Sequence, residues 1–347
     1  MPGPRRGWTT RLLAVALLVL SPICGEYLSG YDESTGHPAA LLSGLIFFVP
    51  LYGCAALLIR EVARRAGLGW IGILLLAATF GLVQAGLVDQ SLFSPDYRGL
   101  DGWEEMVAGT LIAPLGLSAS NLIGFVGGHV MLSIAGPIAL VEGWAPRRSQ
   151  QSWIGIPGLV LCALGYVVAS LLVLQWHLET ESWHAATGQL VGAGLVAVAL
   201  VVLSVVLGRR RRRSHPVRPG GPGLLLTAGV AVVLATVHQC VPLSWLGVAI
   251  SVVVLVTAAI LLVRASRTER WAPVHVALVG AAPLVVTGVI AFTYDPLIGE
   301  VSAGAKYGHN VVMLLIVLGA ALVAVLAGRR ASTAEASTDD PGVRVPL

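Results

Sequence analysis

Long apolar runs alternate with short polar segments along the whole chain. Ten of the runs have a length close to the roughly 20 residues that a helix needs to cross a hydrocarbon core. They lie at residues 8–27, 39–59, 70–88, 121–141, 154–176, 188–207, 223–240, 243–263, 274–294 and 308–327. The pattern predicts an all-α fold, a polytopic transmembrane helical bundle of about ten spans. Helical periodicity adds little, because a helix in lipid is expected to be apolar on all sides.

Cations are confined to every second polar segment. All but two of the 22 Lys and Arg residues lie at Arg5, Arg6, Arg11, Arg60, Arg64, Arg65, Arg147, Arg148, Arg209 to Arg213, Arg218, Arg264, Arg267, Arg270, Arg329, Arg330 and Arg344. The other segments hold only Arg98 and Lys306 as cations. This positive-inside pattern predicts that both termini are cytoplasmic. It also predicts contact between the arginines and anionic lipid headgroups at the cytoplasmic face.

Composition sets the broad class of the protein. With 56% hydrophobic and 12% charged residues the chain is not an ordinary soluble domain. The net charge of +4 comes from arginines at the membrane surface, so we expect no nucleic-acid partner. The preference for Arg, Ala, Val and Gly is typical of a high-GC bacterial genome, and we therefore expect a multi-pass protein of the bacterial cytoplasmic membrane. Residues 21–25 lack an A-x-A-like cleavage site, so the first span is expected to be retained.

The order of the segments predicts two transmembrane halves. Residues 1–208 form an N-terminal half of about six spans with an outer loop at 89–120, and 223–328 form a C-terminal half of about four spans. Residues 209–222 are a basic cytoplasmic linker, and 329–347 a disordered cytoplasmic tail. Residues 106–118 are apolar but short and contain a proline, which predicts an interfacial or re-entrant segment.

Short-range patterns give two more expectations. Gly124 with Gly128, and Gly188 with Gly192, have the G-x-x-x-G spacing that permits close helix packing. The four cysteines lie in or beside apolar spans without C-x-x-C spacing, which indicates small buried residues rather than disulfides or metal ligands.

Polar side chains inside the spans are the candidates for function, since each is costly in lipid and needs a partner. On the predicted topology, eight of them lie in the outer half of the membrane and form a candidate outward-facing pocket: Glu26, Gln84, His129, Ser133, His238, Asp295, His309 and Asn310. The alternative is that the residues at span ends lie in hydrated loops. Four of the eight are candidate ligands for a divalent metal such as zinc: Glu26, His129, His238 and His309. Glu61 and Glu142, at the inner edge, are expected to form superficial ion pairs.

The sequence around His129 resembles a known family. Phe125 to His129 matches the F-x-x-x-H motif of the CPBP family of CAAX-protease and bacteriocin-processing membrane endopeptidases, and residues 79–87 look like the helix that carries its E-E-x-x-x-R motif. In that family the glutamates activate water, and the histidine helps to hold an oxyanion or a metal. Here the double glutamate falls on Gln84 and Ala85 and the arginine on Asp89. Because an amide cannot accept the proton from water, the resemblance implies a relative that is not a competent protease.

Three classes of function remain open at this stage. The first is a degenerate, non-proteolytic CPBP relative that binds peptide or lipid-linked material. The second is a secondary transporter or permease for a small solute, with its site between the two halves. The third is a structural or immunity-type membrane component without chemistry. An intramembrane acid in contact with His129 would favour the first two, and dependence of uptake on an ion gradient would identify the transporter.

Overall fold

A computed structural model describes the backbone of residues 8–210 and 217–338 and the side chains of residues 9–210 and 217–331. Arg5, Arg6, Arg211 to Arg213, Arg344 and the end of the predicted tail lie outside these ranges. The first part of that tail, residues 329–338, is the helical end of α13 rather than a disordered segment.

The prediction of an all-helical membrane bundle is confirmed. Nine helical stretches in the described part of the chain are long and apolar enough to span a membrane: Thr9–Tyr27, Pro38–Ala66, Gly69–Val88, Ala119–Trp144, Ile156–Thr180, Thr187–Arg210, Trp245–Ala265, Pro273–Thr293 and Ala303–Ala331. The shorter apolar helix Leu224–Gln239 brings the apolar helices to the ten expected. Hydrocarbon thickness fixes these lengths, which is why the apolar runs predict them.

Four of the spans are interrupted by π-helical turns. The first span is α1 (Trp8–Pro22) with η1 (Ile23–Tyr27). The next three are α2 (Pro38–Phe48), η2 (Val49–Gly53) and α3 (Cys54–Ala66); α4 (Gly69–Val83) and η3 (Gln84–Val88); and α6 (Ala119–Gly128), η4 (His129–Ala135) and α7 (Gly136–Trp144). After the 3₁₀ turn η5 (Pro146–Arg148) come α8 (Ile156–Thr180), α9 (Thr187–Arg210), α10 (Leu224–Gln239), α11 (Trp245–Ala265), α12 (Pro273–Ile290), η6 (Ala291–Thr293) and α13 (Ala303–Thr338).

The outer loop after η3 folds back over the bundle. It contains the short helix α5 (Trp103–Ala108) and a two-stranded antiparallel hairpin, β1 (Leu111–Ile112) and β2 (Leu117–Ser118). Residues 106–118 therefore do not span the membrane, as predicted, although the hairpin was not foreseen. Trp103 is buried, donates from Nε1 to the Ser94 carbonyl at 2.9 Å and stacks on Phe125 of α6. The loop thus packs on α6 instead of extending into solvent.

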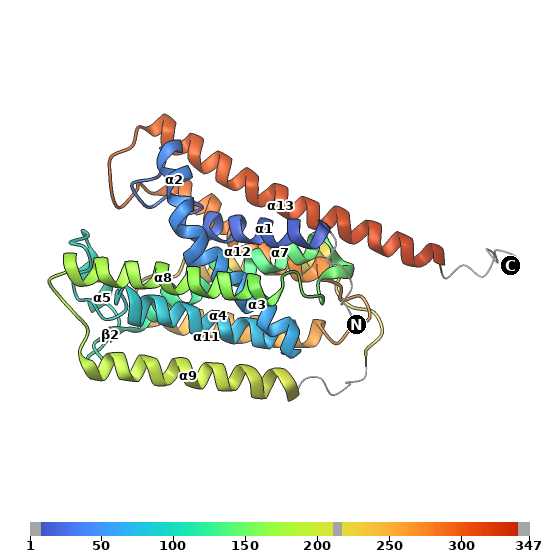
Figure 1. Cartoon of the computed structure of the whole chain (residues 1–347), viewed down its shortest axis with the longest axis horizontal. Helices are drawn as coiled ribbons and strands as arrows, with labels where there is room; N and C mark the ends of the chain where they lie inside the picture. Colours follow the sequence, from blue (N-terminus) through green and yellow to red (C-terminus); the bar gives the residue numbers. More distant parts are fainter. Residues whose placement is uncertain (1–7, 211–216, 339–347) are drawn as a thin grey trace, which may run out of the picture.

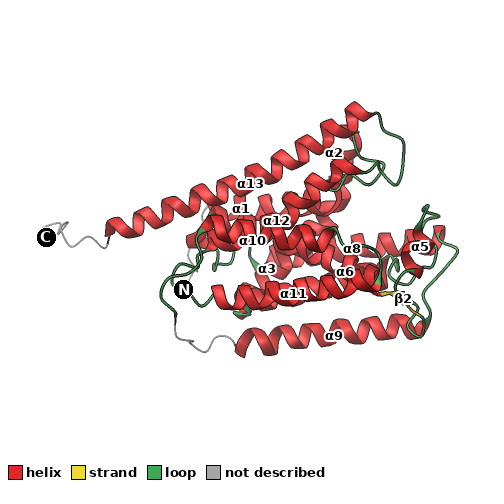
Figure 2. Ribbon diagram, turned by 180° about the vertical axis from the view of Figure 1, so that it is seen from behind, coloured by secondary structure: helices red, strands yellow, loops and turns green. Residues whose placement is uncertain are grey.

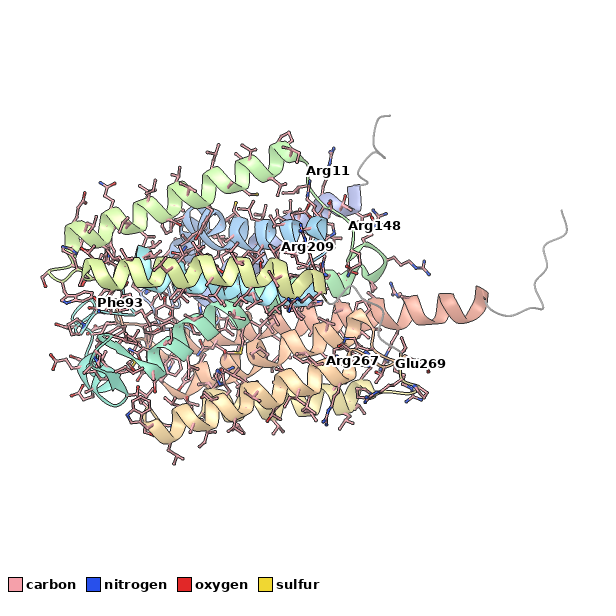
Figure 3. All side chains as sticks on the ribbon, turned by 90° about the horizontal axis from the view of Figure 1, so that it is seen from below. Arg11, Phe93, Arg148, Arg209, Arg267 and Glu269 are labelled. Carbon is pink, nitrogen blue, oxygen red and sulfur yellow. The ribbon has the colours of Figure 1, made fainter. Side chains whose placement is uncertain are left out.

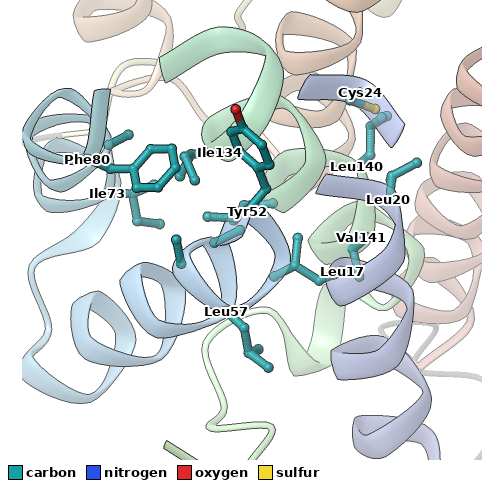
Figure 4. Close-up of a cluster of buried hydrophobic side chains, with 14 of the residues drawn as sticks. Leu17, Leu20, Cys24, Tyr52, Leu57, Ile73, Phe80, Ile134, Leu140 and Val141 are labelled. Carbon is teal, nitrogen blue, oxygen red and sulfur yellow. The ribbon is translucent and has the colours of Figure 1, made fainter. Parts of the chain in front are cut away.

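The core lies between the interrupted spans. About half of the α1, α4 and α12 spans is buried inside the protein, against 11–17% for α8, α9 and α11. In Figure 1, α9 and α13 lie at opposite edges of the bundle, and Figure 2 shows the same arrangement from behind. A central cluster joins Leu17, Leu57, Ile73, Ile134 and Leu140, as drawn in Figure 4. α12 packs against α7, α10 and α13, so helices of both predicted halves share this core.

Charged side chains near the inner edge are buried, which corrects the expectation of superficial ion pairs. Arg60, Glu61, Arg64 and Glu142 are each at most 9% exposed. The Arg60 guanidinium donates to Glu61 Oε1 at 2.5 Å and to Glu142 Oε1 at 3.1 Å, and Arg64 donates to both Glu142 oxygens. Arg60 also lies 3.7 Å from the ring centroid of Trp153, whose backbone N–H donates to Glu61. We refer to these five residues as the inner ionic network.

Arginines gather at one end of the helix bundle. Figure 3 shows Arg11, Arg148, Arg209 and Arg267 at this end and Phe93 at the opposite end. Because positive charge is retained on the cytoplasmic side, the arginine end should face the cytoplasm.

Reporter fusions after Arg65, Arg148, Arg270 and Arg330 should therefore report cytoplasm, and fusions at Asp96, Ser182 and Glu300 the outside. Reversal at two or more of these positions would contradict the topology.

Candidate functional site

Polar residues of four different spans sit on the four π-helical turns. Glu26 lies on η1, Tyr52 on η2, Gln84 on η3, and His129 with Ser133 on η4. A π turn adds a residue to the helix and leaves a carbonyl without its usual i to i+4 partner, and such turns are frequent at functional sites. The turns are also close in space, since η4 packs against η1 and α4, and η2 packs against α1. We call these five residues the π-turn cluster.

Glu26 is the acid of the π-turn cluster. Glu26 is 7% exposed, and its Oε2 accepts a hydrogen bond from the Tyr31 hydroxyl at 2.8 Å. The hydroxyl of Tyr52, also buried, is hydrogen-bonded to the same carboxyl group. Tyr31 lies just outside the span, and the nearby Glu26 carboxylate together with burial raises the pKa of Tyr31 well above its usual range. The hydroxyls of Tyr31 and Tyr52 therefore hold the carboxyl group in place.

His129 is joined to Glu26 through Tyr52. The His129 ring stacks on Tyr52, with ring centroids 5.9 Å apart, and meets the edge of Phe80 at 5.3 Å. Its Nδ1 lies 3.4 Å from Ser133 Oγ, one turn further along η4. The hydroxyl of Tyr52 points out of the apolar core beside Ile134 and Phe80 in Figure 4. Glu26, Tyr52, His129 and Ser133 therefore lie in one chain of neighbouring side chains, joined by hydrogen bonds at its two ends and by ring stacking in its middle.

Gln84 belongs to the same layer but has other partners. Its amide Nε2 donates weakly to the hydroxyls of Tyr166, at 3.5 Å, and Ser170, at 3.4 Å, both on α8. Ala85, which follows it, is fully buried. Neither residue offers a carboxylate. At the two positions of the CPBP double glutamate, this chain therefore has an amide that contacts α8 and a methyl group.

A cavity of about 340 Å³ lies on another face of the α6–η4 helix. Its wall is mostly apolar, and His238, at the end of α10, is the member of the predicted pocket that lines it. His238 is 9% exposed, its Nδ1 is buried without a hydrogen-bond partner, and its Nε2 lies toward Gly127. Further polar groups come from the residues Ser120, Gln239, Ser251, Thr287 and Tyr294. We call this space the α6–α11 cavity.

Two glycines whose spacing permits close helix packing face this cavity. Gly124 and Gly128 line the α6–α11 cavity, and a Cβ atom added to either would meet no atom within 4 Å. Gly188 and Gly192 on α9 are equally open. The close packing that the G-x-x-x-G spacing permits is therefore not found at either pair.

The remaining predicted residues stabilise the structure separately. Asp295 is an exposed loop residue, with its side chain 94% exposed, and pairs with Lys306 at 3.0 Å. His309 Nε2 lies 2.7 Å from the Tyr27 carbonyl, and Asn310 donates to the Ala291 carbonyl at 2.9 Å. The structure thus brings together Glu26, His129 and Ser133 but not all eight predicted residues.

The predicted four-residue metal site is not assembled. Among the described residues, no group of three His, Cys, Asp or Glu side chains is placed to hold a metal ion. Glu26, His129, His238 and His309 are divided between the π-turn cluster, the α6–α11 cavity and the contact with Tyr27. The cysteines are all free, and Cys240 is exposed rather than buried as expected.

Asp89, the first residue after η3, gives a pH-dependent prediction. Burial raises the pKa of Asp89 to about 6, although the Ser91 N–H donates to its Oδ1 at 2.8 Å. A carboxyl whose pKa is higher in the folded state binds more protons there, so its stabilisation is complete below the unfolded pKa of 3.8 and is lost as pH rises through about 6. Asp89→Asn should therefore raise the melting temperature by a few degrees at pH 7.5 and leave it unchanged near pH 4. Thermal unfolding in detergent at both pH values measures this, with exposed Asp96→Asn as the matched control. Equal destabilisation at both pH values would show that the prediction is wrong.

Comparison with known proteins places the whole bundle in one family. A family model described as an uncharacterized membrane protein family matches residues 15–337. The chain belongs to this family. The match includes every helix that carries the π-turn cluster and the α6–α11 cavity, so both lie within the family's common region. No curated protein and no solved structure matches the chain. The family match gives no support to the CPBP resemblance or to a bacterial source.

Sequence reasoning missed Tyr31 and Tyr52, the two hydroxyls that hold Glu26. Tyrosine is ordinary in apolar spans and at their ends, so neither residue stood out. Prolines and glycines near the π turns gave a usable signal: Pro22 precedes η1, Pro50 lies in η2 and Pro137 follows η4. Prolines remove a backbone donor, so three irregular helices were foreseeable even though their convergence was not.

Proposed function

We propose that the protein binds a lipid-linked amphiphile in the outer half of the bacterial cytoplasmic membrane and does not hydrolyse it. The observation that carries the proposal is the α6–α11 cavity, a mostly apolar space with the imidazole of His238 in its wall. Ser120 and Ser251 also line the cavity, so a bound molecule meets a few polar residues in a mostly apolar wall.

The cavity has the size and character of a small-molecule site. Its volume of about 340 Å³ falls in the range of ligand pockets, which are mostly apolar with a few placed polar groups. It extends from Pro242, in the loop before α11, to Ser251, six residues into that helix. Six residues of helix correspond to roughly 9 Å of depth. A ligand of this site reaches hydrocarbon depth, which favours a lipid-linked molecule over a freely soluble one.

The π-turn cluster supports binding without catalysis. Glu26 is its only acid and is held by two tyrosines, while the place of the double glutamate holds Gln84 and Ala85. Activation of water needs a base with a free lone pair directed at the water. The contacts of His129 and Gln84 do not place such a base in the π-turn cluster. We therefore propose that the protein is a degenerate, non-proteolytic relative of the CPBP endopeptidases.

Native mass spectrometry of the gently purified protein tests the proposal. We expect one co-purified lipid-linked molecule per chain, lost from Gly124→Trp, whose side chain fills the cavity, and weakened in His238→Ala. Gly192→Trp is the matched control, because Gly192 is as open as Gly124 but lies on α9 away from the cavity. Equal ligand content in the two tryptophan variants would overturn the site. Detection of a bound peptide would support the cavity as the site but would contradict the lipid-linked ligand.

One observation favours transport as a second candidate function. The cavity lies between α6–η4 of the N-terminal half and α10, α11 and α12 of the C-terminal half, where a transporter would hold its solute. Proteoliposomes with a trapped pH indicator distinguish the two functions. Transport predicts solute-dependent proton movement that Glu26→Gln abolishes, and binding alone predicts none.

A further inference from the structure

A second cavity lies at the arginine end of the bundle, remote from the proposed ligand site. This open cavity of about 340 Å³ lies between the turn η5 and the helix α13. Its lining residues are Trp144, Ala145, Pro146, Arg147, Arg148, Ala327, Arg330 and Ala331. Three arginines therefore line one concave surface, and none of its lining residues in the described part of the chain is acidic.

The charge of the cavity is not neutralised by the inner ionic network next to it. Glu142, the nearest acid in sequence, is buried and accepts hydrogen bonds from Arg60 and Arg64. The ion pairs found among the described residues include none of Arg147, Arg148 and Arg330. The cavity thus presents a local excess of positive charge to whatever enters it.

The inner ionic network also holds this surface in a fixed shape. The Arg148 carbonyl accepts hydrogen bonds from Trp153 Nε1, at 3.1 Å, and from Arg60 Nη2, at 3.5 Å. On the other wall, Trp144 Nε1 donates to the Ala320 carbonyl of α13 at 2.8 Å, which ties the two walls together. A preorganised surface loses less entropy when it binds a ligand.

The chemistry around the cavity identifies the occupant as a lipid rather than a soluble anion. Val323, one helical turn before Ala327, is 48% exposed, and the neighbouring Leu322 and Leu326 are 57% and 44% exposed. Val323 and Leu326 lie one helical turn before the lining residues Ala327 and Arg330, so exposed apolar side chains continue from the cavity along α13. A tryptophan at the rim and cationic residues where the spans end are typical of the headgroup region.

We propose that this cavity is a specific site for a phospholipid with an anionic phosphodiester headgroup. The phosphate binds to the guanidinium groups of Arg147, Arg148 and Arg330, and the acyl chains lie along Val323 and Leu326. Arginine suits this role because its planar group forms paired hydrogen bonds to phosphate. The site is independent of the α6–α11 cavity and of the proposed function.

Native mass spectrometry of delipidated protein titrated with phosphatidylglycerol tests the proposal, with phosphatidylcholine as the zwitterionic comparison. We expect one phosphatidylglycerol to bind first, and at least about tenfold more weakly to Arg147→Gln/Arg148→Gln/Arg330→Gln, because each arginine near an anionic surface contributes a severalfold gain. The matched control is Arg209→Gln/Arg210→Gln/Arg264→Gln, which removes three exposed charges from the same end but outside the cavity.

A second variant leaves the charge unchanged. Ala331→Trp fills the cavity and should also lose the first lipid, so it decides the outcome if the triple variant does not fold. Equal loss in the cavity and control triples would show that only diffuse surface charge attracts the lipid, and would overturn the site. Displacement of the lipid by millimolar inorganic phosphate would overturn the lipid as occupant and indicate a small-anion site.

Discussion

Glu142→Ala should destabilise the protein more than any other single change considered for this chain. Glu142 is 3% exposed and accepts hydrogen bonds from Arg60 and Arg64, which are themselves buried. Removing the carboxylate takes away an acceptor and counter-charge from two guanidinium groups in a low-dielectric environment. Breaking a buried ion pair on one side costs about 3–5 kcal/mol, and we expect a loss of free energy of unfolding of this size.

Unfolding of purified protein in mixed micelles, followed by the accessibility of the buried Cys24, measures this loss. Glu104→Ala is the control, since Glu104 is an exposed acid on the short outer helix α5 and should change stability little. Glu142→Gln, which keeps an acceptor, should fall between the two. A stability of Glu142→Ala equal to that of Glu104→Ala would contradict the inner ionic network as described.

Gly53→Val should have the second largest effect, because α1 and the η2–α3 helix cross at this glycine. A Cβ atom on Gly53 would overlap the backbone carbonyl of Leu18, and a backbone atom has no rotamer by which to move away. Overpacking costs about 1–3 kcal/mol when side chains can adjust, so the loss here should reach at least the upper end of that range. The forced separation would also displace Tyr52, the residue before Gly53, from Glu26.

Gly124→Val is the control for this substitution, since an added side chain there enters open space. Both variants introduce the same apolar side chain at a helical glycine, so the difference between their unfolding midpoints isolates the helix crossing. Gly53→Val should unfold well before Gly124→Val. Equal midpoints would mean that α1 and η2 are further apart than the structure shows.

The helices were predictable because the thickness of the bilayer imposes their length on the sequence. Each of the ten apolar runs corresponds to an apolar helix, and the arginines lie at one end as their distribution indicates. The hairpin at Leu111 to Ser118 was not predictable from composition, because two-residue strands leave no alternating pattern. The sidedness of the bundle and its division into two halves stay predictions.

The depth of the candidate site residues in the bundle was predictable from the sequence, but the direction in which each side chain points was not. Polarity in an apolar span indicates how deep a side chain lies, whereas the partner that it meets depends on how each helix is rotated. Glu26 and His129 came together through Tyr52, while His238 points into the cavity on another face of α6 and His309 contacts the Tyr27 carbonyl. The π turns change this rotation locally, so a regular helical wheel places the residues after them incorrectly. The burial of the inner ionic network was missed for a related reason. Neighbouring residues of opposite charge give the same sequence pattern whether they lie on the surface or are buried where two helices cross.

Labelling of a single engineered cysteine tests the central claim, an outward-facing cavity beside the π-turn cluster, most directly. Gly124→Cys is made in a Cys240→Ser background, because Cys240 is exposed, and intact cells are treated with a membrane-impermeant maleimide. We predict that Gly124→Cys reacts from the outside, more slowly than Cys240 in the native chain but faster than a lipid-facing Gly192→Cys in the same background. If Gly124→Cys is as unreactive as Gly192→Cys, or reacts only when the reagent is given access to the cytoplasm, the outward-facing binding cavity does not exist.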